Sequence, residues 1–146
     1  MAEPMKQTDN DSTPERYSDK TARVSALVVD DEPGNLRLTE LQLKKLGLDV
    51  DTVNDAQQAI DMTLSKQFDM IFMDMRMPVV DGFTAAAQMR ENGLNTPIIA
   101  ITAYAFPEDR QRCINAGCDD YIPKPVDHDL MESIVQKYYP CLGRSR

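Results

Sequence analysis

Side chains capable of metal and phosphoryl chemistry stand at the ends of four apolar runs in this chain. Asp30 and Asp31 come directly after one run, and Asp74 ends another. Thr102 closes a third run, and Lys124 follows a shorter fourth one. Carboxylates held side by side repel each other, which is costly unless a cation sits among them. These residues therefore predict a metal-dependent site that accepts a phosphoryl group.

Length and charge limit the kinds of partner. The chain has 146 residues, enough for one domain with a core but not comfortably for two. Its formal net charge of −8 repels nucleic-acid phosphates and anionic lipids. No apolar stretch is long enough to span a membrane or to act as a signal sequence. We expect a cytoplasmic protein that neither binds nucleic acid directly nor inserts into a membrane.

The cysteines fit the same compartment. Cys113, Cys118 and Cys141 form no metal-ligand spacing with the single His128, and their odd number leaves no complete disulfide framework. A reducing cytoplasm is consistent with that pattern. We expect Cys113 and Cys118 to be small buried hydrophobic residues rather than reactive thiols.

Composition divides the chain into three parts. Residues 1–22 are rich in polar residues and proline, with almost nothing large to bury, which predicts a flexible tail or linker. Residues 23–140 alternate between strand-like and helical segments, and we expect them to form the domain. Residues 141–146 are expected to be a short C-terminal tail.

Five predicted strands alternate with five predicted helices. The strands are expected at residues 24–29, 48–53, 70–73 and 98–101 and around 121–122. The second is half polar and should lie at an edge, whereas the third is apolar throughout and should be central. Such alternation predicts a doubly wound α/β fold with a parallel sheet between two helical layers. We expect the flavodoxin-like form of this fold, whose five strands have the order 2-1-3-4-5. Ligands of such sheets bind beyond the carboxyl ends of the strands, where strand order reverses.

Helix signals lie between these strands. The first helix is expected to open at Pro33 and to stop at Gly47, and the fourth to span residues 107–116. Asn54 or Asp55 can cap the second helix. The second helix is expected to bury the apolar residues Ala56, Ala59, Ile60 and Leu64.

Four fragments in sequence order resemble the receiver domain of two-component response regulators. They are VVDDEPGN, MDMRMPVVDG, ITAYA and DDYIPKP, and the likeness spans about residues 24–139. The residues around Asp74 and the stretch TAYAFPEDRQRCINAGCDDYIPKP are most similar to receivers attached to hybrid histidine kinases. The resemblance implies a signalling module that catalyses its own phosphorylation and dephosphorylation, rather than a turnover enzyme.

The resemblance also implies a metal site and an acceptor. Asp74 would take the phosphoryl group from a phosphohistidine or a small phosphodonor. Mg²⁺, with Mn²⁺ as a substitute, would be bound by Asp31, Asp74 and the backbone carbonyl of Arg76, with Asp30 holding it through water. Lys124 would bind the remaining phosphoryl oxygens.

A second set of residues would report and surround the phosphoryl group. Thr102 would hydrogen-bond a phosphoryl oxygen and, together with Tyr121, form the conformational switch. Ala103 would keep the site open to a donor. Tyr104, with Arg76, would flank the mouth and restrict water, and Pro125 resembles the cis proline that directs the preceding lysine toward the site.

The implied partner is a histidine kinase or a histidine phosphotransfer protein. We expect it to dock on the first helix, through a face that carries Asn35, Leu38, Thr39 and Gln42 as exposed residues. The oligomeric state stays open. The chain is either a single-domain regulator or a receiver from a larger protein.

Three other classes of protein differ from this chain at identifiable residues. A flavin-binding flavodoxin would carry a hydroxyl-rich phosphate loop after the first strand, where this chain has Asp30, Asp31 and Glu32. A hydrolase of the haloacid dehalogenase type would place a second aspartate two residues after its nucleophile, where Arg76 stands here. A degenerate receiver used only for protein contacts would be expected to lack an acid or the lysine, and this chain retains both.

Overall fold

The parallel sheet has the predicted strand order. The computed structural model describes residues 23–103 and 106–140, so both predicted tails and Tyr104 lie outside the described residues. The sheet is ordered β2-β1-β3-β4-β5, with every neighbouring pair parallel. Its strands are β1 (Ser25–Val29), β2 (Asp49–Val53), β3 (Met70–Asp74), β4 (Ile98–Thr102) and β5 (Asp120–Pro123).

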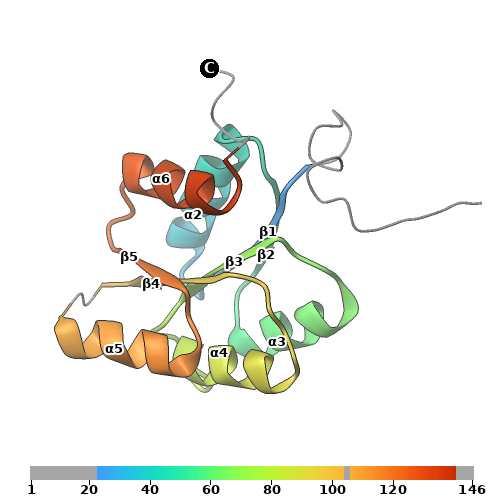
Figure 1. Ribbon diagram of the computed structural model, residues 1–146, viewed down its shortest axis with the longest axis vertical. Helices are drawn as coiled ribbons and strands as arrows, with labels where there is room; N and C mark the ends of the chain where they lie inside the picture. The colour runs from blue at the N-terminus through green and yellow to red at the C-terminus, as the bar shows by residue number, and fades with distance from the viewer. Residues whose placement is uncertain (1–22, 104–105, 141–146) are drawn as a thin grey trace, which may run out of the picture.

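Helices cover both faces of the sheet and make the three layers that were predicted. The helices are α2 (Pro33–Lys45), α3 (Ala56–Ser65), α4 (Gly82–Glu91), α5 (Pro107–Ala116) and α6 (His128–Tyr138). Figure 1 shows α2 and α6 on one face and α3, α4 and α5 on the other, and direct contacts join α2 to α6, α3 to α4 and α4 to α5. The flavodoxin-like α/β prediction is therefore confirmed.

Among the residues that the structure describes, the core consists of two apolar clusters, one on each face of the sheet. Strand β3 is buried at every position, as expected for a central strand, whereas the edge strand β2 is fully buried only at Val53. Each large side chain removed from water contributes about 1.5–3 kcal/mol before the conformational entropy is subtracted. Burial on both sides therefore fixes β1, β3 and β4 in the sheet, and with them the residues at their carboxyl ends.

Acidic caps begin several helices. Glu32, Asp55 and Asp81 each accept a hydrogen bond from a backbone N–H three residues on, at 2.7, 2.7 and 2.9 Å, at the starts of α2, α3 and α4. Such caps satisfy N–H groups that lack helical partners. The expectation that Asn54 or Asp55 caps the second helix is confirmed for Asp55. Gly117 ends α5 with φ 109°, a conformation that glycine adopts readily.

Two expectations about helix faces were wrong. Thr39, expected to be exposed on α2, is only 2% exposed, while Leu38 is 47% exposed. The buried stripe of α2 runs through Thr39, Leu43 and Leu46, a helical spacing that leaves Leu38 outside it. Leu64, expected to be buried, is 65% exposed because the inward stripe of α3 passes through Ala56, Ala59 and Ile60 to the half-buried Thr63.

The expectation that the cysteines are buried core residues is confirmed within the described part of the chain. Cys113 and Cys118 are buried and free, and Cys141 lies outside the described residues. Burial raises the pKa of the Cys118 thiol to about 12, and the neighbouring Cys113 adds to the shift. The thiol therefore stays protonated near neutral pH and behaves as a core residue.

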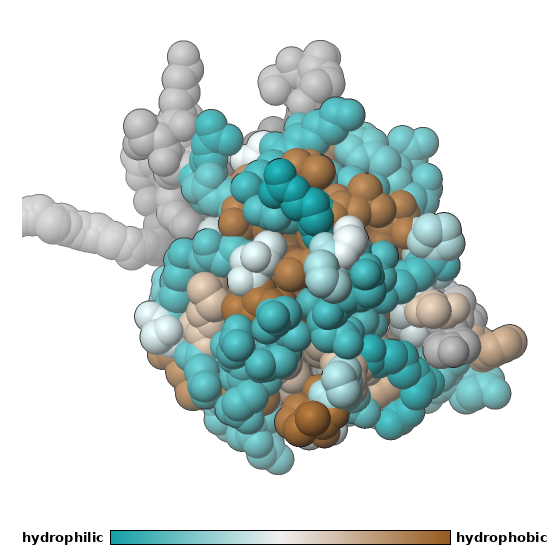
Figure 2. Space-filling view, turned by 180° about the vertical axis from the view of Figure 1, so that it is seen from behind, coloured by the Kyte–Doolittle hydropathy of each residue, from teal (hydrophilic) through white to brown (hydrophobic). Residues whose placement is uncertain are grey.

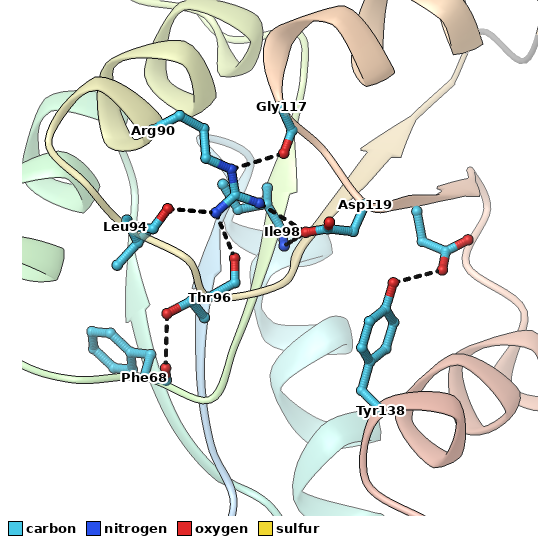
Figure 3. A network of polar contacts seen from close by, with 9 residues as sticks. Phe68, Arg90, Leu94, Thr96, Ile98, Gly117, Asp119 and Tyr138 are labelled. Carbon is cyan, nitrogen blue, oxygen red and sulfur yellow. Dashed lines mark hydrogen bonds and ion pairs between the residues drawn. The ribbon is translucent and has the colours of Figure 1, made fainter.

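One arginine of α4 connects this helix to the end of the sheet that lies opposite the carboxyl ends of the strands. Figure 3 shows the Arg90 guanidinium donating to the backbone carbonyls of Leu94, Thr96 and Gly117, at 2.8–2.9 Å. The same group pairs with Asp119 at 2.8 Å, and Asp119 also accepts the N–H of Ile98 at 2.9 Å. Because Ile98 begins β4 and Asp119 directly precedes β5, this network sets the two strands relative to α4.

One face of the molecule is mainly polar. Figure 2 shows a largely hydrophilic face with hydrophobic side chains in separate patches. Within residues 23–103 and 106–140, no helix combines the length and the apolar character that crossing a bilayer requires.

Candidate functional site

The predicted functional side chains meet at the carboxyl edge of the sheet. Asp74 ends β3 and Thr102 ends β4, while Asp30 and Lys124 directly follow β1 and β5. The register brings these ends together, since Asp74 pairs with the residue before Thr102, and Thr102 pairs with the residue before Lys124. The edge lies at the reversal of strand order between β1 and β3, where parallel sheets bind ligands.

Three carboxylates form a compact group at this edge. Oxygens of Asp30, Asp31 and Asp74 lie within 4.8 Å of one another. Asp30 is 2% exposed and Asp74 is 4% exposed, so little solvent screens their repulsion, whereas Asp31 is exposed. Hard divalent cations such as Mg²⁺ prefer oxygen ligands of this kind. The donor set therefore fits a divalent cation that is open to solvent on the Asp31 side.

Lys124 contributes one positive charge to this group. Its Nζ lies 3.2 Å from Asp74 Oδ2 and 3.5 Å from Asp30 Oδ2. Burial raises the pKa of Asp30 above its usual range and the Asp74 charge adds to the rise, while the Glu32 N–H and Lys124 partly oppose it. One ammonium thus balances the carboxylates only in part, which leaves an electrostatic role for a cation.

Thr102 and Tyr121 lie on neighbouring strands and the same face of the sheet. Tyr121 pairs with Ala100, which stands two residues before Thr102, and alternate residues of a strand point to the same side. Thr102 is buried. The Tyr121 ring is half-buried against the cluster that contains Ala100, with the Arg110 guanidinium 4.9 Å from its centroid. The Thr102 hydroxyl at the site and the Tyr121 ring near α5 therefore lie on the same face of the sheet.

Arg76 makes contacts that the sequence did not predict. Its backbone N–H donates to Asp74 Oδ1 at 3.1 Å, and its guanidinium pairs with Asp109 of α5 at 3.4 Å. The same guanidinium lies 5.8 Å from the Phe83 ring, which the Arg112 guanidinium approaches to 4.0 Å. Sequence reasoning gave Arg76 a metal-binding carbonyl and a place at the mouth but missed these contacts. No local signal marks them, because Asp109 lies 33 residues away in the chain.

The remaining flanking residues can be placed in part. Ala103 is exposed directly after Thr102. The peptide bond between Lys124 and Pro125 is cis, as the family resemblance implied. Tyr104 was predicted to flank the mouth and lies outside the described residues.

Gly82 allows α4 to begin directly against the Asp74 backbone. A Cβ at this position would overlap the Asp74 carbonyl oxygen and would lie 2.8 Å from Met75 Cα. We expect Gly82→Ala to lower the free energy of unfolding by roughly 3 kcal/mol, since backbone atoms must move to relieve the overlap. Urea denaturation measures this loss. Gly34→Ala is the control, because its Cβ would meet only the Glu32 side chain, at 3.1 Å; equal losses in both variants would contradict the argument.

Comparison with known families gives a match over most of the chain. The profile of the response regulator receiver domain family matches residues 26–136. The sensor histidine kinase RcsC of Escherichia coli K12 is 37% identical over 120 residues, which cover 82% of this chain and 13% of the kinase. The hybrid signal transduction histidine kinase L of Dictyostelium discoideum is also 37% identical over 120 residues, covering 77% of this chain and 7% of that protein. The chain thus spans a small fraction of these relatives.

Solved structures give the same likeness in three dimensions. The receiver domain of the sensor histidine kinase PA1611 from Pseudomonas aeruginosa is 39% identical with a TM-score of 0.75, covering 82% of this chain and 99% of that one. Its structure holds a magnesium ion coordinated in the active-site cleft. The receiver domain of Ssk1 from Saccharomyces cerevisiae is 26% identical with a TM-score of 0.74, covering 80% of this chain and 88% of that one. It was crystallised with the histidine phosphotransfer protein Ypd1.

Proposed function

Because the chain belongs to the response regulator receiver domain family of two-component signalling, we propose that it accepts a phosphoryl group from a phosphohistidine onto Asp74 in the presence of Mg²⁺. The observation that carries the proposal is the position of the Asp74 carboxylate, which lies among two further carboxylates and 3.2 Å from Lys124 Nζ. A degenerate receiver used only for protein contacts would not need this complete set.

The proposed reaction is a direct phosphoryl transfer. An Asp74 carboxylate oxygen attacks the phosphorus, the phosphorus–nitrogen bond of the phosphohistidine breaks, and the imidazole leaves with the electron pair. The products are an aspartyl phosphate and a free histidine. Lys124 stabilises the negative charge on the phosphoryl oxygens, and its distance from Asp74 suits that role.

The residues around Asp74 also fit a metal-assisted reaction. Asp30, Asp31, Asp74 and the backbone carbonyl of Arg76 would hold the ion, Asp30 through water. When bound, Mg²⁺ supplies charge neutralisation and orients the phosphoryl oxygens. Mn²⁺ would suit the same oxygen ligands.

We infer that the conformational response runs through Thr102 and Tyr121. The Thr102 hydroxyl donates to a phosphoryl oxygen, and the Tyr121 ring turns into the space that this movement releases. Their shared sheet face supports the coupling. Because Arg110 of α5 contacts the Tyr121 ring, movement of the ring would alter the α5 surface.

The proposed donor is a histidine kinase or a histidine phosphotransfer protein that docks on α2. In-line transfer requires the donor imidazole within a few ångströms of the Asp74 oxygen. The N-terminal end of α2 directly follows the acidic pair, and its exposed leucines Leu38 and Leu41 can contact a protein surface. The buried Thr39 is excluded from that contact.

Leu38→Glu is expected to separate the two kinds of donor. Transfer from a phosphorylated histidine phosphotransfer protein should slow at least about tenfold, because a charged residue replaces a leucine that the proposed contact would cover. Labelling by acetyl phosphate, which needs no docking surface, should stay unchanged. Both rates are measured with Mg²⁺ and a panel of phosphorylated histidine phosphotransfer proteins that includes Ypd1, using the donor that labels the wild type fastest.

Leu64→Glu is the matched control, since Leu64 is an exposed leucine on α3. It should leave both rates at the wild-type level. Loss of both rates in Leu38→Glu, or of neither, would argue against docking on α2. A wild-type protein that neither donor labels would overturn the proposed function itself.

A further inference from the structure

The loop between β3 and α4 holds a strained residue at its tip. Val79 has φ 69°, and the Val80 N–H donates to the Pro78 carbonyl at 2.8 Å, which closes a three-residue turn around Val79. Such a turn with positive φ at its centre is rare and strained, especially for a β-branched residue. The Val79 side chain is fully exposed, so burial of this side chain does not offset the strain.

The fold requires a turn here, but it does not require valine. Met75 and Met77 are buried before the turn, and the Gly82 N–H donates to the Met75 carbonyl at 3.1 Å after it. The chain must therefore reverse direction between Met77 and Gly82. Glycine or asparagine would adopt the positive φ at lower cost. The stability of the domain thus explains the turn and leaves the exposed valine unexplained.

We propose that Val79 is a contact residue for the histidine-bearing protein that donates to Asp74, packing into an apolar patch beside its histidine. This inference rests on the function proposed above. Both ends of the loop are fixed next to Asp74: β3 runs into one end, and α4 begins at Gly82, against the Asp74 backbone. A protein whose imidazole reaches the Asp74 oxygen would therefore lie close to this loop.

The chemistry of Val79 favours a protein over other occupants. An apolar side chain on a constrained turn can be buried with little loss of conformational freedom, which suits a protein contact. A small phosphodonor has no apolar surface that would cover it. The net charge of −8 disfavours nucleic acid. Val79 and the exposed Leu38 would together give the partner apolar contacts on the loop and on α2.

Val79→Asn tests the proposal because stability and transfer should change in opposite directions. Asparagine tolerates the positive φ, so the melting temperature should rise by a few degrees. Transfer from a phosphorylated histidine phosphotransfer protein should slow about tenfold, since an apolar contact is lost. Labelling by acetyl phosphate should match the wild type. Val79→Ile, which stays apolar, should retain most of the transfer rate, and Leu64→Asn controls for loss of an exposed apolar residue elsewhere.

Each outcome bears on the inference. Wild-type transfer by Val79→Asn would overturn it, and so would an equal loss with both donors, which would mean that the turn positions Asp74. A lower melting temperature would contradict the strain argument. If acetyl phosphate labels the wild type but no histidine donor does, the inferred contact between Val79 and a histidine-bearing protein is refuted. If neither donor labels the wild type, the proposed function fails first.

Discussion

Asp74→Asn should abolish labelling by acetyl phosphate, because the amide offers no carboxylate oxygen to attack phosphorus. The two remaining carboxylates should not substitute. Asp31 is exposed, and Asp30 lies farther than Asp74 from Lys124 Nζ, at 3.5 against 3.2 Å. Intact-mass spectrometry after incubation with acetyl phosphate and Mg²⁺ measures the result. Asp61→Asn, which changes an exposed aspartate of α3, is the control and should be labelled like the wild type.

The same experiment tests the metal. Excess chelator should prevent labelling of the wild type, since the carboxylate cluster repels an anionic phosphoryl group unless a cation neutralises it. Mg²⁺ alone should raise the melting temperature of the wild type, because it binds the folded cluster. Asp74→Asn should show a smaller rise. Undiminished labelling of Asp74→Asn, or full labelling in chelator, would refute the assignment.

Lys124→Ala should damage both stability and phosphorylation. Without Mg²⁺, two buried carboxylates lose the ammonium that lies 3.2 and 3.5 Å away, and the free energy of unfolding should fall by about 3 kcal/mol. Labelling by acetyl phosphate should slow by roughly 100-fold, the order of loss found when one charge-stabilising donor is removed from an active site. Urea denaturation and initial labelling rates measure the two effects.

Magnesium should separate the two roles of Lys124. Saturating Mg²⁺ should restore much of the stability of Lys124→Ala, because the cation neutralises the same carboxylates. The labelling rate should nevertheless stay below that of the wild type at the same Mg²⁺ concentration. Lys137→Ala is the control. It removes an exposed ion pair with Asp120 and should cost under about 1 kcal/mol without affecting labelling. A Lys124→Ala labelling rate equal to the wild-type rate at saturating Mg²⁺ would leave Lys124 a structural role only.

The sequence by itself determined the architecture and the edge that carries the site. Apolar runs alternating with helical segments identify a parallel sheet, and the polarity of each strand indicates which is central and which lies at an edge. Asp30, Asp74, Thr102 and Lys124 could be predicted to meet because each stands at a strand end, and parallel strands bring those ends to one edge. Strand boundaries differed from prediction by only one or two residues, as at β1, which begins at Ser25.

The tertiary structure alone decided how helices turn about their axes and which distant side chains meet. Propensity and capping act over a few residues, so they place α2 and α3 but not their buried faces, and Thr39 and Leu64 were assigned to the wrong ones. The contact of Arg76 with Asp109 depends on how α5 packs beside α4. The positive φ of Val79 arises because both ends of its loop are held by the core. Such features depend on how all three layers pack together, and no short stretch of sequence determines that packing.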